Sequence, residues 1–112
     1  RHDRLARATR AGVQALGLTL FAEHPGAACT AVKAPDGISG DAIVKGLRKR
    51  GITIAGGQGS MKGTMFRIAH MGYVEAFDVL TALAGVEMVL ADLGYPVKLS
   101  AGVQAAEQLL RK

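Results

Sequence analysis

The chain has 112 residues, a net charge of +5 and 49% hydrophobic residues. This composition excludes a disordered chain, and the length predicts one domain over residues 1–112 with no room for a large cofactor-binding sheet as well. Cys29 is the only cysteine, which excludes an internal disulfide or a zinc site of paired cysteines and fits a cytoplasmic location. We expect no membrane segment and no metal site, because no suitable apolar run or ligand spacing occurs.

The first half of the chain predicts two helices that flank two short strands. Apolar residues at helical spacing predict a helix over residues 3–16, and apolar runs predict strands over 18–22 and 28–34. Ser39 is a good N-cap for a helix over about 40–50, whose last turn is basic. The start and stop signals of this second helix agree with each other.

The next segment predicts a strand pair joined by a glycine-rich loop. Residues 52–55 and 64–69 have strand character, and the loop 56–63 lies between them, so we expect antiparallel neighbours. Glycine-rich loops can also cradle phosphate through backbone amides. A phosphate-binding loop of the Gly-Lys-Ser/Thr kind leads into a helix, however, whereas this loop leads into a strand, which favours a hairpin.

The last third of the chain predicts two helices. Residues 74–93 form the longer one, and its apolar positions, Phe77 and Met88 among them, cover so much of the circumference that we expect burial on more than one side. Ser100 is the expected N-cap of the last helix, over about 101–111. Adjacent strands and separate helices predict an α+β fold: a small, mostly antiparallel sheet of three to four strands with helices packed on one face.

Two side chains near the end of strand 64–69 are candidates for a functional role. Arg67 lies between Phe66 and Ile68, and its alternation with them favours a solvent-facing side chain, although its planar guanidinium is also suited to hold a carboxylate. His70 has no carboxylate or second histidine beside it in sequence, which favours a structural role. We identify no catalytic residue, because no nucleophile–base pair and no paired acids are visible.

A resemblance to a known family extends over essentially the whole chain. The segments that carry it are Gly51–Gly59, Lys62-Gly63 and Phe66–Tyr73. They resemble the C-terminal small domain of a class V (fold type I) pyridoxal-phosphate aminotransferase, in the alanine–glyoxylate and serine–glyoxylate (or serine–pyruvate) group, which includes soluble hydrogenase subunit homologues. Ala69 stands where the family usually has glycine.

The resemblance implies a role in binding substrate. Arg67 would pair with the carboxylate of a small amino acid or 2-keto acid, and an active-site loop would comprise Gly56, Gly57, Gln58 and Gly59. Pyridoxal phosphate would be the cofactor of the intact enzyme, with the chain's own large domain and a second subunit as partners. The Schiff-base lysine would lie in that large domain, so we expect this fragment to hold no cofactor and to be inactive alone.

Two alternative functions follow from other features of the sequence. The net charge and the basic run Lys45–Arg50 predict a nucleic-acid-binding module, in which a glycine loop would contact the backbone. In KH domains, however, such a loop joins two helices, and stacking aromatics are scarce in this chain. The open face of a small sheet would alternatively suit a ligand-sensing or dimerisation domain.

Overall fold

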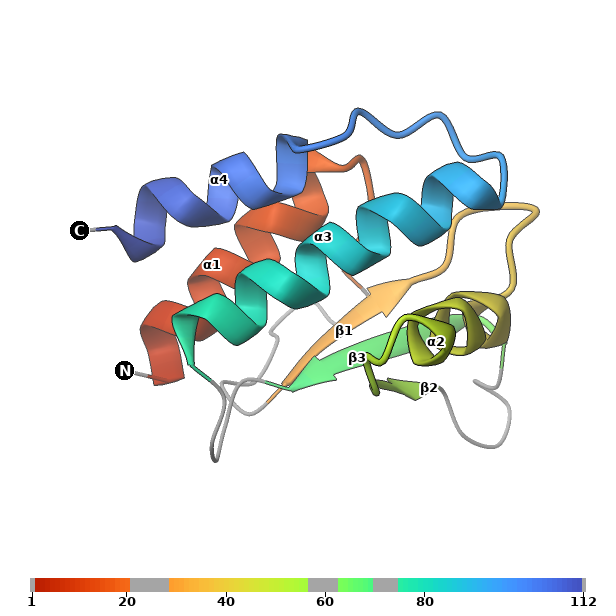
Figure 1. Cartoon of the computed structure of the whole chain (residues 1–112), viewed down its shortest axis with the longest axis horizontal. Helices are drawn as coiled ribbons and strands as arrows, with labels where there is room; N and C mark the ends of the chain where they lie inside the picture. Colours follow the sequence, from red (N-terminus) through yellow and green to blue (C-terminus); the bar gives the residue numbers. More distant parts are fainter. Residues whose placement is uncertain (1, 21–28, 57–62, 70–74, 112) are drawn as a thin grey trace.

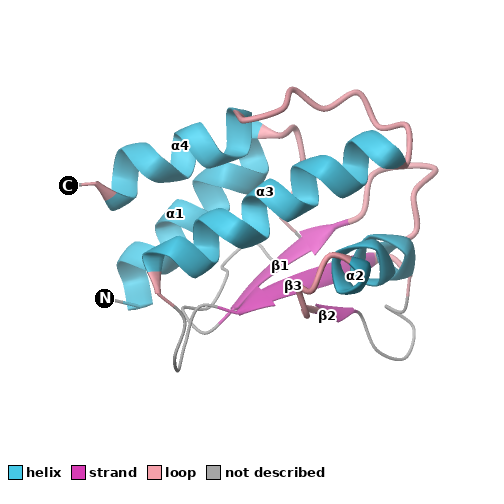
Figure 2. Cartoon of the chain, in the orientation of Figure 1, coloured by secondary structure: helices cyan, strands magenta, loops and turns pink. Residues whose placement is uncertain are grey.

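The computed structural model describes residues 2–20, 29–56, 63–69 and 75–111. Helices pack with a small antiparallel sheet, as Figures 1 and 2 show, so the predicted α+β class is confirmed. The elements in chain order are α1 (His2–Ala15), β1 (Cys29–Lys33), α2 (Gly40–Lys49), β2 (Ala55–Gly56), β3 (Met65–Ala69), α3 (Ala76–Asp92) and α4 (Ala101–Leu110).

The sheet has the strand order β1-β3-β2, and both pairings are antiparallel as predicted. β3 lies in the centre, so its middle residue has a neighbour on each side: Arg67 pairs with Ala31 of β1 and with Ala55 of β2. The strand predicted over 18–22 is present, within the described residues, as a single bridge from Leu20 to Val32.

The strand predicted over 52–55 is mostly wrong, because β2 comprises Ala55 and Gly56. The reason lies at the end of α2. The Ile52 N–H donates to the Leu47 carbonyl at 2.9 Å, which ties the start of this segment to the helix. Ile52 and Ile54 then pack against the core, and the chain reaches β3 at Ala55.

In Figure 1, α1, α3 and α4 lie above the sheet, and α2 is drawn at the level of β3. α1 packs against β1 and α3, α2 packs against α3 and β3, and α4 packs on α1 and α3. The side chains between helices and sheet are almost entirely apolar and fully buried. Their largest members are Phe66, Ile43, Leu47, Leu83, Leu90, Val13, Val32, Val79 and Val86.

Helix α3 packs against α1, α2 and α4, so it is buried on more than one side as expected, but two of the apolar residues assigned to its buried faces are exposed. Phe77 is 80% exposed and Met88 is 49% exposed, whereas the charged residue Glu87 is 4% exposed. Phe77 lies in the first turn of α3 and lines a shallow groove with Leu80 and Leu110. The apolar stripe that meets the core therefore follows Val79, Leu83, Val86 and Leu90 instead.

Both ends of α4 are held by side chains of other helices. The Glu87 carboxylate accepts hydrogen bonds from the backbone N–H groups of Ser100 at 2.7 Å, Gly102 at 2.9 Å and Val103 at 3.0 Å. The Arg4 guanidinium donates to the Leu110 carbonyl. Ser100 is at the N-cap position directly before α4, as predicted. Its side chain makes no capping hydrogen bond, however, so the expected side-chain cap is wrong. A carboxylate at the N-terminus and a guanidinium at the C-terminus both complement the helix dipole.

In the described part of the chain, no helix combines the length and the apolar character that crossing a membrane requires.

Candidate functional site

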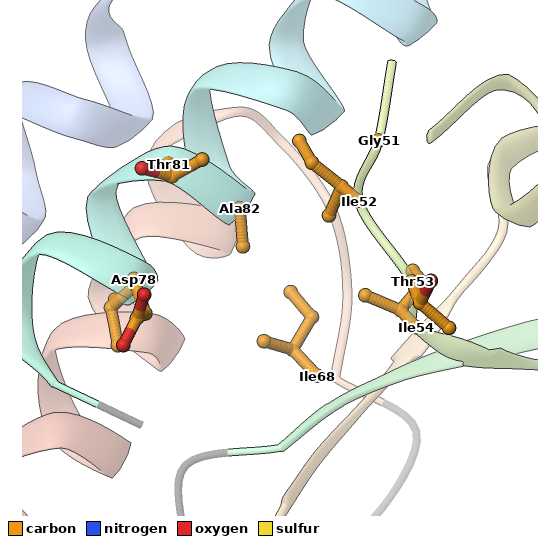
Figure 3. Close-up of a pocket in the computed structure, with 9 residues that line it drawn as sticks. Gly51, Ile52, Thr53, Ile54, Ile68, Asp78, Thr81 and Ala82 are labelled. Atoms are coloured by element: carbon orange, nitrogen blue, oxygen red, sulfur yellow. The ribbon is translucent and has the colours of Figure 1, made fainter. Parts of the chain in front are cut away.

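Arg67 projects from the face of the sheet that is turned away from the helices. Its neighbours Phe66 and Ile68 are 0% and 3% exposed, and Figure 3 shows the Ile68 side chain pointing toward α3. Because successive side chains of a strand point to opposite faces, Arg67 points away from the helical layers. The Arg67 side chain thus points to the solvent side of the sheet, as the sequence favoured. It is only partly exposed, however.

The surroundings of Arg67 leave one of its donors buried and without a partner. Its Nε atom is inaccessible to solvent and makes no hydrogen bond with any residue that the structure describes. A buried polar group without a partner costs about 1–3 kcal/mol, and more if the group is charged. Such an atom in a native fold calls for an explanation, and one explanation is an anion that this arginine is built to receive.

Alanines pair with Arg67 on both neighbouring strands. Ala31 of β1 and Ala55 of β2 lie directly opposite it in the register of the sheet. Neither neighbouring strand therefore places a charged residue in register with the arginine. No signal in a single sequence identifies these alanines, because strand register is not visible in it.

The predicted active-site loop falls only partly within the described residues. Gly56 follows Ala55 in β2, so the loop leaves the sheet directly beside the neighbour of Arg67. Gly57, Gln58 and Gly59 lie outside the described residues, as does His70. The structure therefore brings Gly56 and Arg67 onto adjacent strands and leaves the other predicted site residues untested.

A hollow lies on the face of the sheet opposite to Arg67, between the sheet and the helices. Figure 3 shows it between the segment 51–54 and α3, with Ile68 at its base. Two of its polar groups already bond to α3 or its N-cap: the Asp78 carboxylate accepts from the Glu75 N–H at 2.7 Å, and the Thr81 hydroxyl donates to the Phe77 carbonyl at 2.8 Å. The described residues that line this hollow include no lysine or arginine, so it lacks a cationic donor for an anion.

The lysines give no sign of a cofactor site in the described part of the chain. A lysine that forms a Schiff base is usually activated by a desolvated or cationic environment. Lys33, Lys45, Lys49 and Lys98 are all exposed to solvent. The described residues also contain no cluster of histidine, cysteine or carboxylate side chains that could hold a metal ion. These lysines do not fit pyridoxal phosphate, and we derive no chemical step through it here.

The basic end of α2 carries a solvated cluster of cations. Lys45, Arg48 and Lys49 are exposed, and Arg50 forms an ion pair with Asp92 at 2.7 Å. Arg48 and Lys49 lie in the last turn of α2, where positive charge complements the helix dipole. The cluster therefore has a structural explanation in the helix itself.

Comparison with known proteins found no matching family model, but it found close relatives. An uncharacterized aminotransferase of Methanocaldococcus jannaschii is 45% identical to this chain, over 100% of the chain and 30% of the relative. The serine–glyoxylate aminotransferase of Arabidopsis thaliana is 42% identical, over 99% of the chain and 29% of the relative. The chain thus spans about 30% of the length of the curated relatives that it matches.

A solved structure gives the same result. The ureidoglycine–glyoxylate aminotransferase of Bacillus subtilis superimposes with a TM-score of 0.93 at 33% identity, over 99% of this chain and 30% of that one. The fold around Arg67 is thus that of the C-terminal part of an aminotransferase. More particularly, the chain belongs to the class V aminotransferases, among the serine– and alanine–glyoxylate and related enzymes, as the resemblance indicated.

Proposed function

We propose that this chain is the part of a pyridoxal-phosphate-dependent aminotransferase that binds the carboxylate of the substrate. The intact enzyme would move an amino group between a small amino acid and a 2-keto acid. The observation that carries this proposal is Arg67, whose buried Nε makes no hydrogen bond with a described residue, on the sheet face that lacks helices.

The chemistry of transamination explains why a fixed arginine is useful. The amino group is exchanged for a keto oxygen, whereas the carboxylate stays the same in donor and acceptor. A guanidinium that binds this carboxylate with two parallel hydrogen bonds serves both half-reactions and fixes the orientation of the reacting carbon. Ala31 and Ala55 are the residues in register with it on the two neighbouring strands.

The remaining parts of the enzyme would come from outside this chain. Pyridoxal phosphate supplies the electron sink when it is bound in the intact enzyme. We propose that its Schiff-base lysine lies in a large domain of the same polypeptide, and that a second subunit completes a homodimer. The loop at Gly56, Gly57, Gln58 and Gly59 would lie at the mouth of the site, and the intact enzyme would be cytoplasmic. The 112-residue chain alone would be inactive.

Replacing Arg67 in the full-length enzyme tests this role. Arg67→Ala should lower kcat/KM by the equivalent of about 2–5 kcal/mol, because a charge-assisted bidentate contact is lost. Arg67→Lys should recover part of that loss, since it keeps the charge without the planar fork. Steady-state kinetics with several amino donors measure both effects.

The matched control is Arg48→Ala, which removes an exposed arginine from α2. It should leave kcat/KM at the wild-type value, and all three variants should keep the absorbance of the bound cofactor. Wild-type kinetics for Arg67→Ala would refute the proposed role.

A further inference from the structure

The first turn of α2 lies against both ends of the glycine-rich loop. The Gly40 N–H donates a hydrogen bond to the Gly63 carbonyl at 2.8 Å, where the loop returns to the sheet. At the other end, a Cβ added to Gly56 would lie 3.5 Å from the Asp41 carboxylate. Gly40 is therefore bonded to the residue where the loop returns to β3, and the Asp41 carboxylate lies near the residue where the loop leaves β2.

Gly40 also approaches the backbone of β3 more closely than a side chain would allow. A Cβ added at Gly40 would lie 2.5 Å from the Met65 carbonyl oxygen and 3.1 Å from its nitrogen. Both atoms are backbone, so no change of rotamer could relieve the contact. Glycine is required where two backbones come this close.

This contact is close to the proposed carboxylate site. Met65 begins β3, two residues before Arg67 and on the same face of the strand. Gly56 directly follows Ala55, the β2 partner of Arg67. The start of α2 thus touches both strands within two residues of the pair that contains the arginine.

We propose that Gly40 is a positioning residue for Arg67. This inference rests on the proposed function. The first turn of α2 fixes the positions of the start of β3 and of the end of β2. Its close approach fixes where the guanidinium meets the substrate carboxylate. Gly40 itself touches no substrate and acts through the β3 backbone.

Gly40→Ala is the direct test, and Gly46→Ala is its matched control. Both change glycine to alanine in the same helix, so both gain helix propensity. The added methyl at Gly46 would lie 2.8 Å from the Val89 side chain of α3, away from the loop ends. Both variants should lose stability through crowding, but only Gly40→Ala should displace β3.

Each variant is made in the full-length enzyme and measured in two ways. Gly40→Ala should lower kcat/KM by about 10- to 100-fold, mainly through a higher KM, because the carboxylate is misplaced relative to its anchor. It should also speed deuterium exchange in the peptide 63–69. Gly46→Ala should keep the wild-type KM and the wild-type exchange in that peptide.

Asp41→Ala is a second variant in case Gly40→Ala does not fold. Asp41 is exposed, so its removal leaves the core intact, while it takes away the carboxylate that lies near Gly56. It should raise KM and speed exchange over residues 52–56, whereas Asp36→Ala, in an exposed turn, should do neither. A wild-type KM for Asp41→Ala would count against the inference.

The outcomes separate this inference from the proposed function. If Arg67→Ala lowers kcat/KM but Gly40→Ala keeps the wild-type KM, or matches Gly46→Ala, the positioning role is overturned and the carboxylate role stands. If Arg67→Ala has wild-type kinetics, the proposed function fails, and the positioning role fails with it, even if exchange shows that α2 supports β3.

Discussion

Phe77 shows how little a single apolar residue says about burial. It lies in the first turn of α3 with most of its surface exposed. Phe77→Ser should therefore change the free energy of unfolding by no more than about 0.5 kcal/mol, as surface substitutions generally do. Urea unfolding followed by circular dichroism measures this.

Leu83→Ala is the comparison from the buried side of the same helix. Leu83 is fully buried, and truncation of such a residue costs about 2–5 kcal/mol. A loss of similar size for Phe77→Ser would show that this phenylalanine is packed in solution.

The errors of sequence interpretation at single residues share one physical cause. Helix α3 is apolar on most sides, so its pattern has no clear phase, and Phe77 and Met88 were assigned to the core. Glu87 was missed because carboxylates are almost never buried without partners, and its partners lie 13 to 16 residues further along the chain. Arg67 was selected as a candidate because a strand arginine between apolar neighbours stands out locally, and its carboxylate-binding role, which comes from the family resemblance, stays a prediction.

At the scale of elements, the connection between α3 and α4 gives a measurable prediction. Glu87→Ala removes the acceptor for three backbone N–H groups at the start of α4 and should cost about 3–5 kcal/mol. Glu87→Gln keeps one acceptor oxygen and should cost less. Thermal and urea unfolding measure both.

Glu107→Ala is the control for that pair, because Glu107 is an exposed carboxylate on α4 itself. It should change the stability by less than about 0.5 kcal/mol. Equal stabilities for Glu87→Ala and Glu107→Ala would contradict the capping role of Glu87.

The elements themselves were predicted well where their signals are local. Ser39 accepts from the Asp41 N–H at 3.1 Å and starts α2 where the sequence indicated. The expected strand at 52–55 failed because its first residue is bound to the end of α2, a tertiary contact that propensity does not encode. The α+β class followed from the order of elements, whereas the position of α4 in an outer layer did not.

At the scale of the whole molecule, the sheet separates two kinds of surface. One face is covered by helices and carries the apolar core, and the other presents Arg67 between two alanines. The sequence indicated the arginine and the glycine loop as candidates, but the residues that lie beside the arginine in the sheet depend on strand register. That register pairs Ala31 with Arg67, which are more than thirty positions apart in the sequence.

The isolated 112-residue chain gives a test at this scale. The four lysines that the structure describes, Lys33, Lys45, Lys49 and Lys98, are all exposed, so we expect no specific binding of pyridoxal phosphate at them. When pyridoxal phosphate is titrated with the chain, its absorbance spectrum should be the same as in a titration with an unrelated protein of similar lysine content. A saturable spectral change that survives dilution would contradict the assignment of the cofactor to the remainder of the enzyme.

Helix α4 packs on α1 and α3, and Glu87 and Arg4 form hydrogen bonds with the backbone at its two ends. Its attachment therefore runs through other helices and bypasses β3. Substitutions in α4 should therefore change the stability of the fold, whereas the carboxylate binding that we propose for Arg67 should stay the same.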